Sequence, residues 1–260
     1  QSPSQNKNSL LFLKGDDIIQ LFKNREQEVL NAVKKAYMAH AAHKTTMPPN
    51  AYLRFPGMEK ERIIAKPAWI GGDFNSAGIK WIASFPKNRT KNLDRASATL
   101  ILNSTETGHP TAVMESSIIS AYRTAASAAL AAKVLMTRKS NEVNTVGLVG
   151  CGYINYETLR FLLAVFPNLQ TLLLHDLSPD LAEKFANKTS DLKSDLKAHF
   201  IKDFNHLLSQ TDLISIATTA VHPFIKNLDE YIPGTVILHI SLRDLVPEII
   251  LNADNITDDI

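Results

Sequence analysis

Cysteine is nearly absent from this chain, which has a single one, Cys151, among its 260 residues. One thiol cannot close a disulfide within the chain, so the fold must hold together without a covalent cross-link. Secreted proteins often rely on disulfides, whereas cytoplasmic proteins keep their thiols reduced. The cysteine count therefore predicts a cytoplasmic setting.

Long apolar runs are also lacking, and no stretch approaches the roughly 20 residues that cross a bilayer. The first eight residues, QSPSQNKN, are polar and have no apolar centre of the kind found in signal peptides. We therefore expect neither a membrane span nor a secretory leader.

Concentrated positive charge and metal-binding patterns are missing too. The net charge is only +2 and the basic residues are spread along the chain, which argues against a nucleic-acid partner. His40 and His43 lie close in sequence, but no third ligand accompanies them, so no metal site is expected. With 45% hydrophobic and 21% charged residues, the composition is typical of a soluble globular enzyme.

The first part of the chain predicts an α+β region. Helices are expected after Gly15 and over residues 26–43, and a long Ala-rich helix over about 115–136. Short strands separated by Pro and Gly turns are expected at 10–13, 52–55, 62–65, 77–82, 97–102 and 111–114. We place a domain hinge around the Ala-rich helix.

From about Asn141 onward, strands and helices alternate. Strands are expected at 145–149, 171–174, 199–201, 213–217 and 235–240, with helices at 156–165, 179–188 and 204–210. Such alternation implies parallel strands joined by right-handed crossovers. The predicted fold class is α/β, with an α+β domain over residues 1–118 and a Rossmann-type doubly wound sheet over 119–260.

A glycine motif joins the strand 145–149 to the next helix. The run Gly150-Cys-Gly152-Tyr153-Ile154-Asn155 has the G-x-G spacing of a dinucleotide-binding turn, with Asn155 where a third small residue is usual. In such a turn the first glycine makes the bend, and the second lets a pyrophosphate approach the helix N-terminus. The alternative is an ordinary turn that binds no nucleotide. Cys151, with no base near it in sequence, is interpreted as a small turn residue.

An acidic residue, Asp176, ends the next predicted strand. An acid at this place hydrogen-bonds the adenosine ribose hydroxyls and repels a 2′-phosphate. The sequence therefore favours NAD as the cofactor.

Four basic residues lie before or within the predicted Ala-rich helix: Arg54, Lys80, Arg95 and Arg123. A charge inside an apolar element is costly to bury without a partner, and an anionic substrate would explain several of them together. Each also has a simpler explanation, as a solvated edge residue, a side chain extending to water, or half of an ion pair.

Asp244 follows the last predicted strand, where ligands gather in open α/β sheets. An acid there is placed for proton transfer near a nicotinamide. The alternatives are a helix N-cap or a pair with Arg243.

Several segments resemble the ornithine cyclodeaminase/mu-crystallin family over a region from about residue 10 to the end of the chain. They are GIKWI at 78–82, PKN at 86–88, ESSIISAYRTAA at 115–126, GCG at 150–152 and SLRD at 241–244. The segment containing Arg-Thr-Ala-Ala is the most specific. The resemblance also implies a homodimer formed through the sheet of the first domain, and a further segment after Ile260 that returns to that domain.

The resemblance implies roles for individual residues. Arg54, Lys80 and Arg123 match positions that hold a substrate carboxylate, Arg95 is an added clamp, and Asp244 and Lys80 are the catalytic pair, with Asp244 activating water. The implied cofactor-binding residues are Ser97, Arg123, Thr124, Gly150, Gly152, Tyr153, Ile154, Asp176, Thr218, Thr219 and Ser241.

Within the family, the likeness is greatest to a branch that cleaves an opine-type amine. The segments behind this choice are YLR at 52–54, RIIA at 62–65, IGG at 70–72, KWIAS at 80–84 and RAS at 95–97. In that branch, NAD takes hydride from the Cα of a secondary amine joining two amino-acid skeletons. Hydrolysis then gives 2-oxoglutarate and L-2,3-diaminopropionate, a precursor of siderophores and peptide natural products.

Two alternatives stay open. An ornithine cyclodeaminase would recycle the cofactor and produce no net NADH. A non-catalytic NAD(P)H-binding protein like mu-crystallin would bind the cofactor without turnover, although the presence of Arg54, Lys80, Arg123 and Asp244 speaks against it. A substrate with three carboxylates accounts for the basic residues better than ornithine, which has one.

Overall fold

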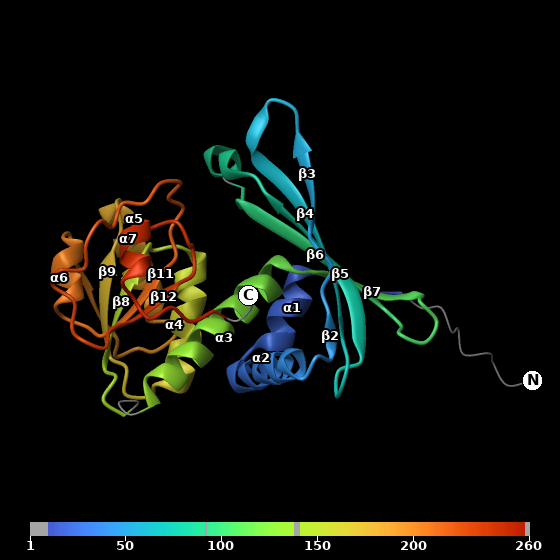
Figure 1. The fold of residues 1–260 in the computed structure, drawn as a ribbon, viewed down its shortest axis with the longest axis horizontal. Coiled ribbons are helices and arrows are strands. Elements are labelled where there is room, and N and C mark those ends of the chain that lie inside the picture. The colour runs from blue at the N-terminus through green and yellow to red at the C-terminus, as the bar shows by residue number, and fades with distance from the viewer. Residues whose placement is uncertain (1–9, 92, 138–140, 258–260) are drawn as a thin grey trace, which may run out of the picture. The chain divides into compact units, whose positions relative to one another are not determined.

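The computed structural model describes residues 10–91, 93–137 and 141–257 (Figure 1). The expectations for residues 1–8 therefore lie outside the described part of the chain. The chain divides into two compact units, one comprising residues 1–25 and 31–120 and the other residues 26–30 and 121–260. They are called here the first unit and the second unit.

The first unit is built on a seven-stranded mixed sheet. Its strands are β1 (Leu11–Leu13), β2 (Thr45–Thr46), β3 (Ala51–Phe55), β4 (Met58–Ile70), β5 (Ser76–Ser84), β6 (Ala96–Asn103) and β7 (Pro110–Glu115). The order is β1-β7-β6-β5-β4-β2, and β3 also pairs with β4. The β1–β7 pair is parallel and the other pairs are antiparallel.

Helix α1 (Gly15–Phe22) packs against β7, and its Ile18 is fully buried. The buried strand residues Ala98 and Ala112 lie on one face of the sheet, which we call the covered face. Helix α2 (Glu26–Ala41) follows α1, a 3₁₀ helix spans Pro86–Lys91, and α3 (Ser117–Leu135) leads into the second unit. The sheet and its helices confirm the expected α+β character of this region.

Strand β4 is much longer than the sequence indicated. The expected strand covered residues 62–65, but β4 extends from Met58 through Pro67 to Ile70. Pro67 is tolerated because it falls between the part of β4 paired with β3, which ends at Ala65, and the part paired with β2, which begins at Trp69. A proline without an N–H fits where no neighbouring strand needs that donor.

The second unit is a five-stranded parallel sheet with helices. Its strands are β8 (Thr145–Val149), β9 (Thr171–His175), β10 (Lys197–Phe200), β11 (Leu213–Ile216) and β12 (Val236–His239), in the order β10-β9-β8-β11-β12. Its helices are α4 (Tyr153–Val165), α5 (Pro179–Thr189), α6 (Phe204–Leu208) and α7 (Pro247–Leu251). This is the predicted Rossmann-type order, in which the chain reverses direction across the sheet at β8.

The central strands of this unit are apolar on both faces, and this made them predictable from the sequence. Val146, Leu148, Leu172, Leu174 and Ile214 are almost completely buried, as expected for parallel strands covered on both faces. In the described part of the chain, no helix is both long and apolar enough to cross a membrane. The carboxyl ends of these five strands define the edge where a ligand would bind.

Candidate functional site

The turn after β8 is built around Gly150. Its φ is +90°, a conformation that favours glycine, and a Cβ here would lie 2.5 Å from the carbonyl oxygen of Ala217. The Gly150 N–H donates to the carbonyl of His175 at 2.8 Å. The turn is therefore fixed between the ends of β9 and β11, and no other residue fits at its first position.

Gly152 occupies a different environment. It is the N-cap of α4, and a Cβ added to it would meet nothing within 4 Å. Because glycine has no side chain to cap the helix, the first-turn N–H groups of α4 are left to an external acceptor. Open space beside free amide donors suits the pyrophosphate of a dinucleotide, so the residues present fit the expected cofactor.

Asp176 follows β9 and is anchored by two backbone donors. Its Oδ2 accepts from the Cys151 N–H at 2.7 Å, and its Oδ1 accepts from the Ser178 N–H at 2.9 Å. Each oxygen keeps lone pairs that can accept further hydrogen bonds. The predicted ribose-binding acid therefore lies directly beside the glycine turn.

Cys151 and Tyr153 flank Gly152. Burial and the nearby Asp176 raise the pKa of the Cys151 thiol to about 12, which makes it inert as a nucleophile at neutral pH. Burial also raises the pKa of Tyr153, as does its hydrogen bond with the buried Glu157. The Tyr153 hydroxyl is thus held along the first turn of α4, and Glu157 is paired with Arg160 at 2.8 Å.

Asp244 is completely buried at the end of the sheet beyond β12. Thr218 donates its hydroxyl to Oδ1, and Ser241 donates its hydroxyl to Oδ2. The Arg243 N–H donates to the same Oδ2 at 3.3 Å, and His239 Nε2 lies 3.1 Å from it. Asp244 therefore joins the loops that follow β11 and β12, and the predicted residues Thr218 and Ser241 are brought together by it.

The electrostatic state of Asp244 follows from these contacts. Burial raises the pKa of the carboxyl, but the hydrogen bonds from Ser241, Thr218, Arg243 and His239 lower it by more. The net effect holds the pKa below its usual value, so the carboxylate is ionised at neutral pH. Sequence reasoning missed His239, although its place at the end of a strand was a usable signal.

In the first unit, the structure brings Arg54 and Lys80 onto one face of the sheet. Arg54 lies opposite Arg62 across β3 and β4, and Lys66 lies opposite Lys80 across β4 and β5. Side chains alternate along a strand, so all four point to the covered face. The Lys80 ammonium donates to the Ser120 hydroxyl at 3.1 Å, and the Arg54 guanidinium lies 5.7 Å from the Tyr52 ring centroid.

These two cation pairs were not visible in the sequence. Like charges placed directly opposite each other in a sheet repel, and a bound anion would relieve that repulsion. Neither Arg62 nor Lys66 forms an ion pair with a described residue. The neighbouring Glu61 has a buried oxygen that forms no hydrogen bond with any described residue, but Glu61 precedes Arg62 and belongs to the opposite face.

The remaining predicted residues are distributed as follows. Ser97 lies opposite Ala83, on the face of the sheet away from Lys80, and Arg95 stands just before β6. Arg123 and Thr124 are on α3, in the second unit, and Arg123 is exposed. Thr219 is exposed beside Thr218, and Ile154 is in the first turn of α4. The assigned roles of these residues stay predictions.

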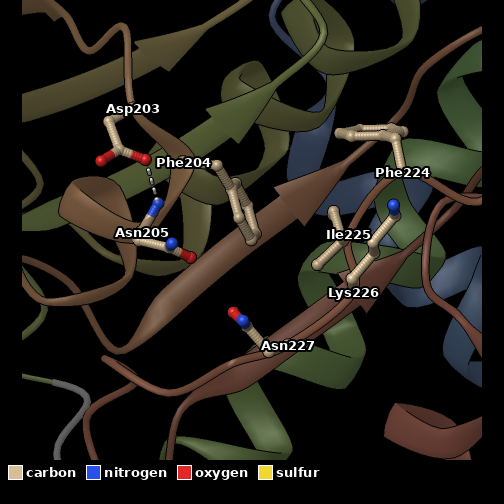
Figure 2. Close-up of a pocket in the computed structure, with 7 residues that line it drawn as sticks. All are labelled: Asp203, Phe204, Asn205, Phe224, Ile225, Lys226 and Asn227. Atoms are coloured by element: carbon tan, nitrogen blue, oxygen red, sulfur yellow. Dashed lines mark hydrogen bonds between the residues drawn. The ribbon is translucent and has the colours of Figure 1, made fainter.

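A separate pocket of about 220 Å³ lies in the second unit (Figure 2). It is lined by residues 203–205 at the start of α6 and residues 224–227 from the connection between β11 and β12. The Asp203 carboxylate accepts the Asn205 N–H at 3.0 Å and so caps α6. None of the residues lining this pocket is among the predicted site residues.

A model of a known protein family matches most of the chain. The model described as the ornithine cyclodeaminase/mu-crystallin family matches residues 16–258. An N-((2S)-2-amino-2-carboxyethyl)-L-glutamate dehydrogenase from Staphylococcus aureus is 32% identical over 254 residues, which is 96% of this chain and 74% of the relative.

Two solved structures are also similar. One is the Thermococcus litoralis Δ1-pyrroline-2-carboxylate reductase in complex with NADH and L-proline, with a TM-score of 0.79 and 26% identity. The other is an archaeal alanine dehydrogenase dimer with bound NAD, with a TM-score of 0.77 and 32% identity. The matches cover 87% and 88% of this chain, and 67% and 66% of those chains. This chain thus spans about two thirds of the length of each.

Proposed function

The chain belongs to the ornithine cyclodeaminase/mu-crystallin family, and on this premise we propose that it is an NAD-dependent amino-acid dehydrogenase. We further propose that its substrate is N-(2-amino-2-carboxyethyl)-L-glutamate, which it cleaves to 2-oxoglutarate and L-2,3-diaminopropionate. The S. aureus relative carries the name of this dehydrogenase. The product would serve siderophore or peptide assembly in the cytoplasm.

The second unit supplies the cofactor site. Gly152 and the first turn of α4 would hold the pyrophosphate, and Asp176 would accept the ribose hydroxyls. A carboxylate at that position disfavours a 2′-phosphate, which supports NAD over NADP. When bound, NAD supplies the acceptor for a hydride.

The observation that carries the substrate proposal is the double cation pair on the covered face. Arg54 with Arg62, and Lys66 with Lys80, place four positive charges on three adjacent strands. A substrate with three carboxylates offers these cations three negatively charged partners, whereas ornithine offers one carboxylate and adds a distal ammonium. Arg suits two-point carboxylate binding, and Lys supplies a point charge.

The proposed reaction consumes NAD and water and needs no other co-reactant. Removal of hydride from the glutamate Cα, with loss of the N–H proton, leaves a C=N bond. Water adds to that carbon and the C–N bond breaks, giving the keto oxygen of 2-oxoglutarate and an amine of diaminopropionate.

Asp244 would accept a proton during water addition. Because both of its oxygens are covered, we propose that the proton passes through the hydroxyl of Ser241 or Thr218, each of which donates to the carboxylate. Lys80 would hold a substrate carboxylate in place during this step.

We propose that the protein is a homodimer. The face of the first sheet opposite the covered face carries an apolar row that crosses five strands: Phe12, Val113, Ile101, Ile79 and Pro67. Beside this row, Trp81 and Trp69 are each more than a third exposed. A second copy of the chain is the proposed partner, as in the archaeal alanine dehydrogenase dimer.

The test is a substrate comparison with purified protein and NAD. We expect reduced nicotinamide and 2-oxoglutarate to form together with the glutamate–diaminopropionate amine, and no net NADH with ornithine or alanine. Conversion of ornithine to proline without net NADH would replace the proposal by a cyclodeaminase. NADH binding without turnover of any amine would favour the non-catalytic alternative.

A further inference from the structure

Asn155 replaces the third small residue of the glycine motif, and the structure gives it a set of contacts that a small residue cannot make. The side chain is completely buried in the first turn of α4. Its Nδ2 donates to the carbonyl of Gly150 at 2.7 Å and to that of Val149 at 2.9 Å. Its Oδ1 accepts from the Ser215 hydroxyl on β11 at 2.7 Å. All polar atoms of this buried amide are therefore engaged.

The bond to the Gly150 carbonyl fixes more than one atom. The Gly150 carbonyl and the Cys151 N–H belong to one planar trans peptide, so they point in opposite directions. Asn155 holds the carbonyl end of that peptide, and Asp176 holds the N–H end at 2.7 Å. The peptide cannot rotate without breaking both hydrogen bonds.

We propose that Asn155 is a positioning residue that sets the orientation of Asp176 and thereby the preference for NAD. A continuous series of hydrogen bonds runs from Ser215 through Asn155 and the Gly150–Cys151 peptide to Asp176. The second Asp176 oxygen is held by the Ser178 N–H, so the carboxylate is anchored from both sides. This inference rests on the proposed NAD site and assigns its selectivity to a residue behind the ligand.

The consequence is a selective effect on cofactor binding. Without Asn155, the peptide gains freedom to rotate, and the Cys151 N–H releases Asp176. The ribose hydroxyls of NADH then lose a fixed acceptor. The 2′-phosphate of NADPH, in contrast, is repelled less by the carboxylate. A residue that merely fills space would change the binding of both cofactors in parallel.

The test measures the Kd of NADH and of NADPH by nicotinamide fluorescence, together with the Tm, for the wild type and for Asn155→Ala. We expect the Kd of NADH to rise about tenfold, as for loss of a buried hydrogen-bonded partner, and the NADPH/NADH ratio of Kd values to fall. Ser215→Ala removes only the hydroxyl behind Asn155, and we expect a smaller change in the same direction.

The matched control is Thr158→Val. Thr158 is equally buried and lies about one turn further along α4, and its hydroxyl donates to the Ile154 carbonyl of its own helix at 2.8 Å. This change should lower the Tm without altering the ratio. If Asn155→Ala lowers the Tm but leaves the ratio unchanged, as Thr158→Val does, the inference is overturned and the NAD site stands. If Asn155→Ala does not fold, an unchanged ratio in Ser215→Ala overturns it in the same way. A wild type that binds neither cofactor overturns the proposed function and this inference together.

Discussion

Gly150 and Gly152 stand two residues apart in one turn, yet different constraints act on them. Gly150 is required by the chain itself, because its φ is +90° and the Ala217 carbonyl leaves no room for a Cβ. Gly152 has open space where a Cβ would be, so nothing in the chain requires a glycine there. We propose that the small size of Gly152 serves the approach of the cofactor.

This difference predicts opposite outcomes for two alanine substitutions. Gly150→Ala should lower the free energy of unfolding by about 2–4 kcal/mol through backbone strain and overpacking. Gly152→Ala should cost about 1 kcal/mol or less, as for an N-cap change, yet abolish NADH binding. Thermal melts and NADH fluorescence measure both, and full NADH binding by Gly152→Ala would contradict the placement of the pyrophosphate.

Asp244 predicts a pH effect on stability. Its folded pKa lies below the unfolded value of about 3.9, so its contribution is fully present above that pH and is lost as the pH falls through the folded pKa. Asp244→Asn should remove this part of the acid dependence of the Tm between about pH 5 and about pH 2. At neutral pH it should cost about 1–3 kcal/mol through weakened buried hydrogen bonds.

The control for this prediction is Asp254→Asn, since Asp254 is exposed near the end of the described chain. It should leave the acid dependence of the Tm unchanged. An equal acid dependence in wild type and Asp244→Asn would show that the hydrogen bonds to Asp244 do not hold its pKa down.

At the scale of elements, the parallel half was the more predictable one. Most of its strands are short apolar runs such as Thr145–Val149, and β8, β9 and β10 are each followed directly by a helix. Helix α4 nevertheless begins at Tyr153, three residues before the expected start. The sequence offers no Ser, Thr or Asp at the N-cap, where Gly152 stands instead, so the usual signal for a helix start is missing.

What the sequence did not show was strand register. Lys80 drew notice as a charge inside an apolar strand, but Lys66 did not, and nothing local reveals that the two lie opposite each other. Likewise, Arg62 is a candidate for substrate binding only because the structure places it opposite Arg54. Long-range pairing depends on the whole hairpin, so the proposed anion-binding face could not be predicted from either strand alone.

The cation pairs on the covered face predict that removing one charge raises stability but weakens substrate binding. Lys66→Met should stabilise the protein by up to about 1 kcal/mol, because it removes a repulsion directly opposite Lys80. It should also raise the KM for the tri-acid about tenfold, because a charged contact with substrate is lost. Lys60→Met, at an exposed position of the same strand, is the control and should change neither. A lower Tm for Lys66→Met, or an unchanged KM, would contradict the proposed role of the pairs.

At the scale of the whole molecule, the exposed apolar face of the first unit predicts self-association. Trp81→Lys places a charge beside the apolar row and should convert a dimer to a monomer in light scattering after size exclusion. Val134→Lys changes an apolar residue that is 65% exposed on α3, in the second unit, and should leave the dimer intact. A Trp81→Lys protein that stays dimeric would show that the dimer interface does not lie on this face.

We propose that the chain removes a hydride from the Cα of an amine rich in carboxylates. The most direct measurement uses NAD and the glutamate–diaminopropionate amine carrying deuterium at the glutamate Cα. We expect one deuterium in the NADH, detected by mass spectrometry, and an equal amount of 2-oxoglutarate. NADH without the label, or 2-oxoglutarate formed without NADH, would contradict this reaction.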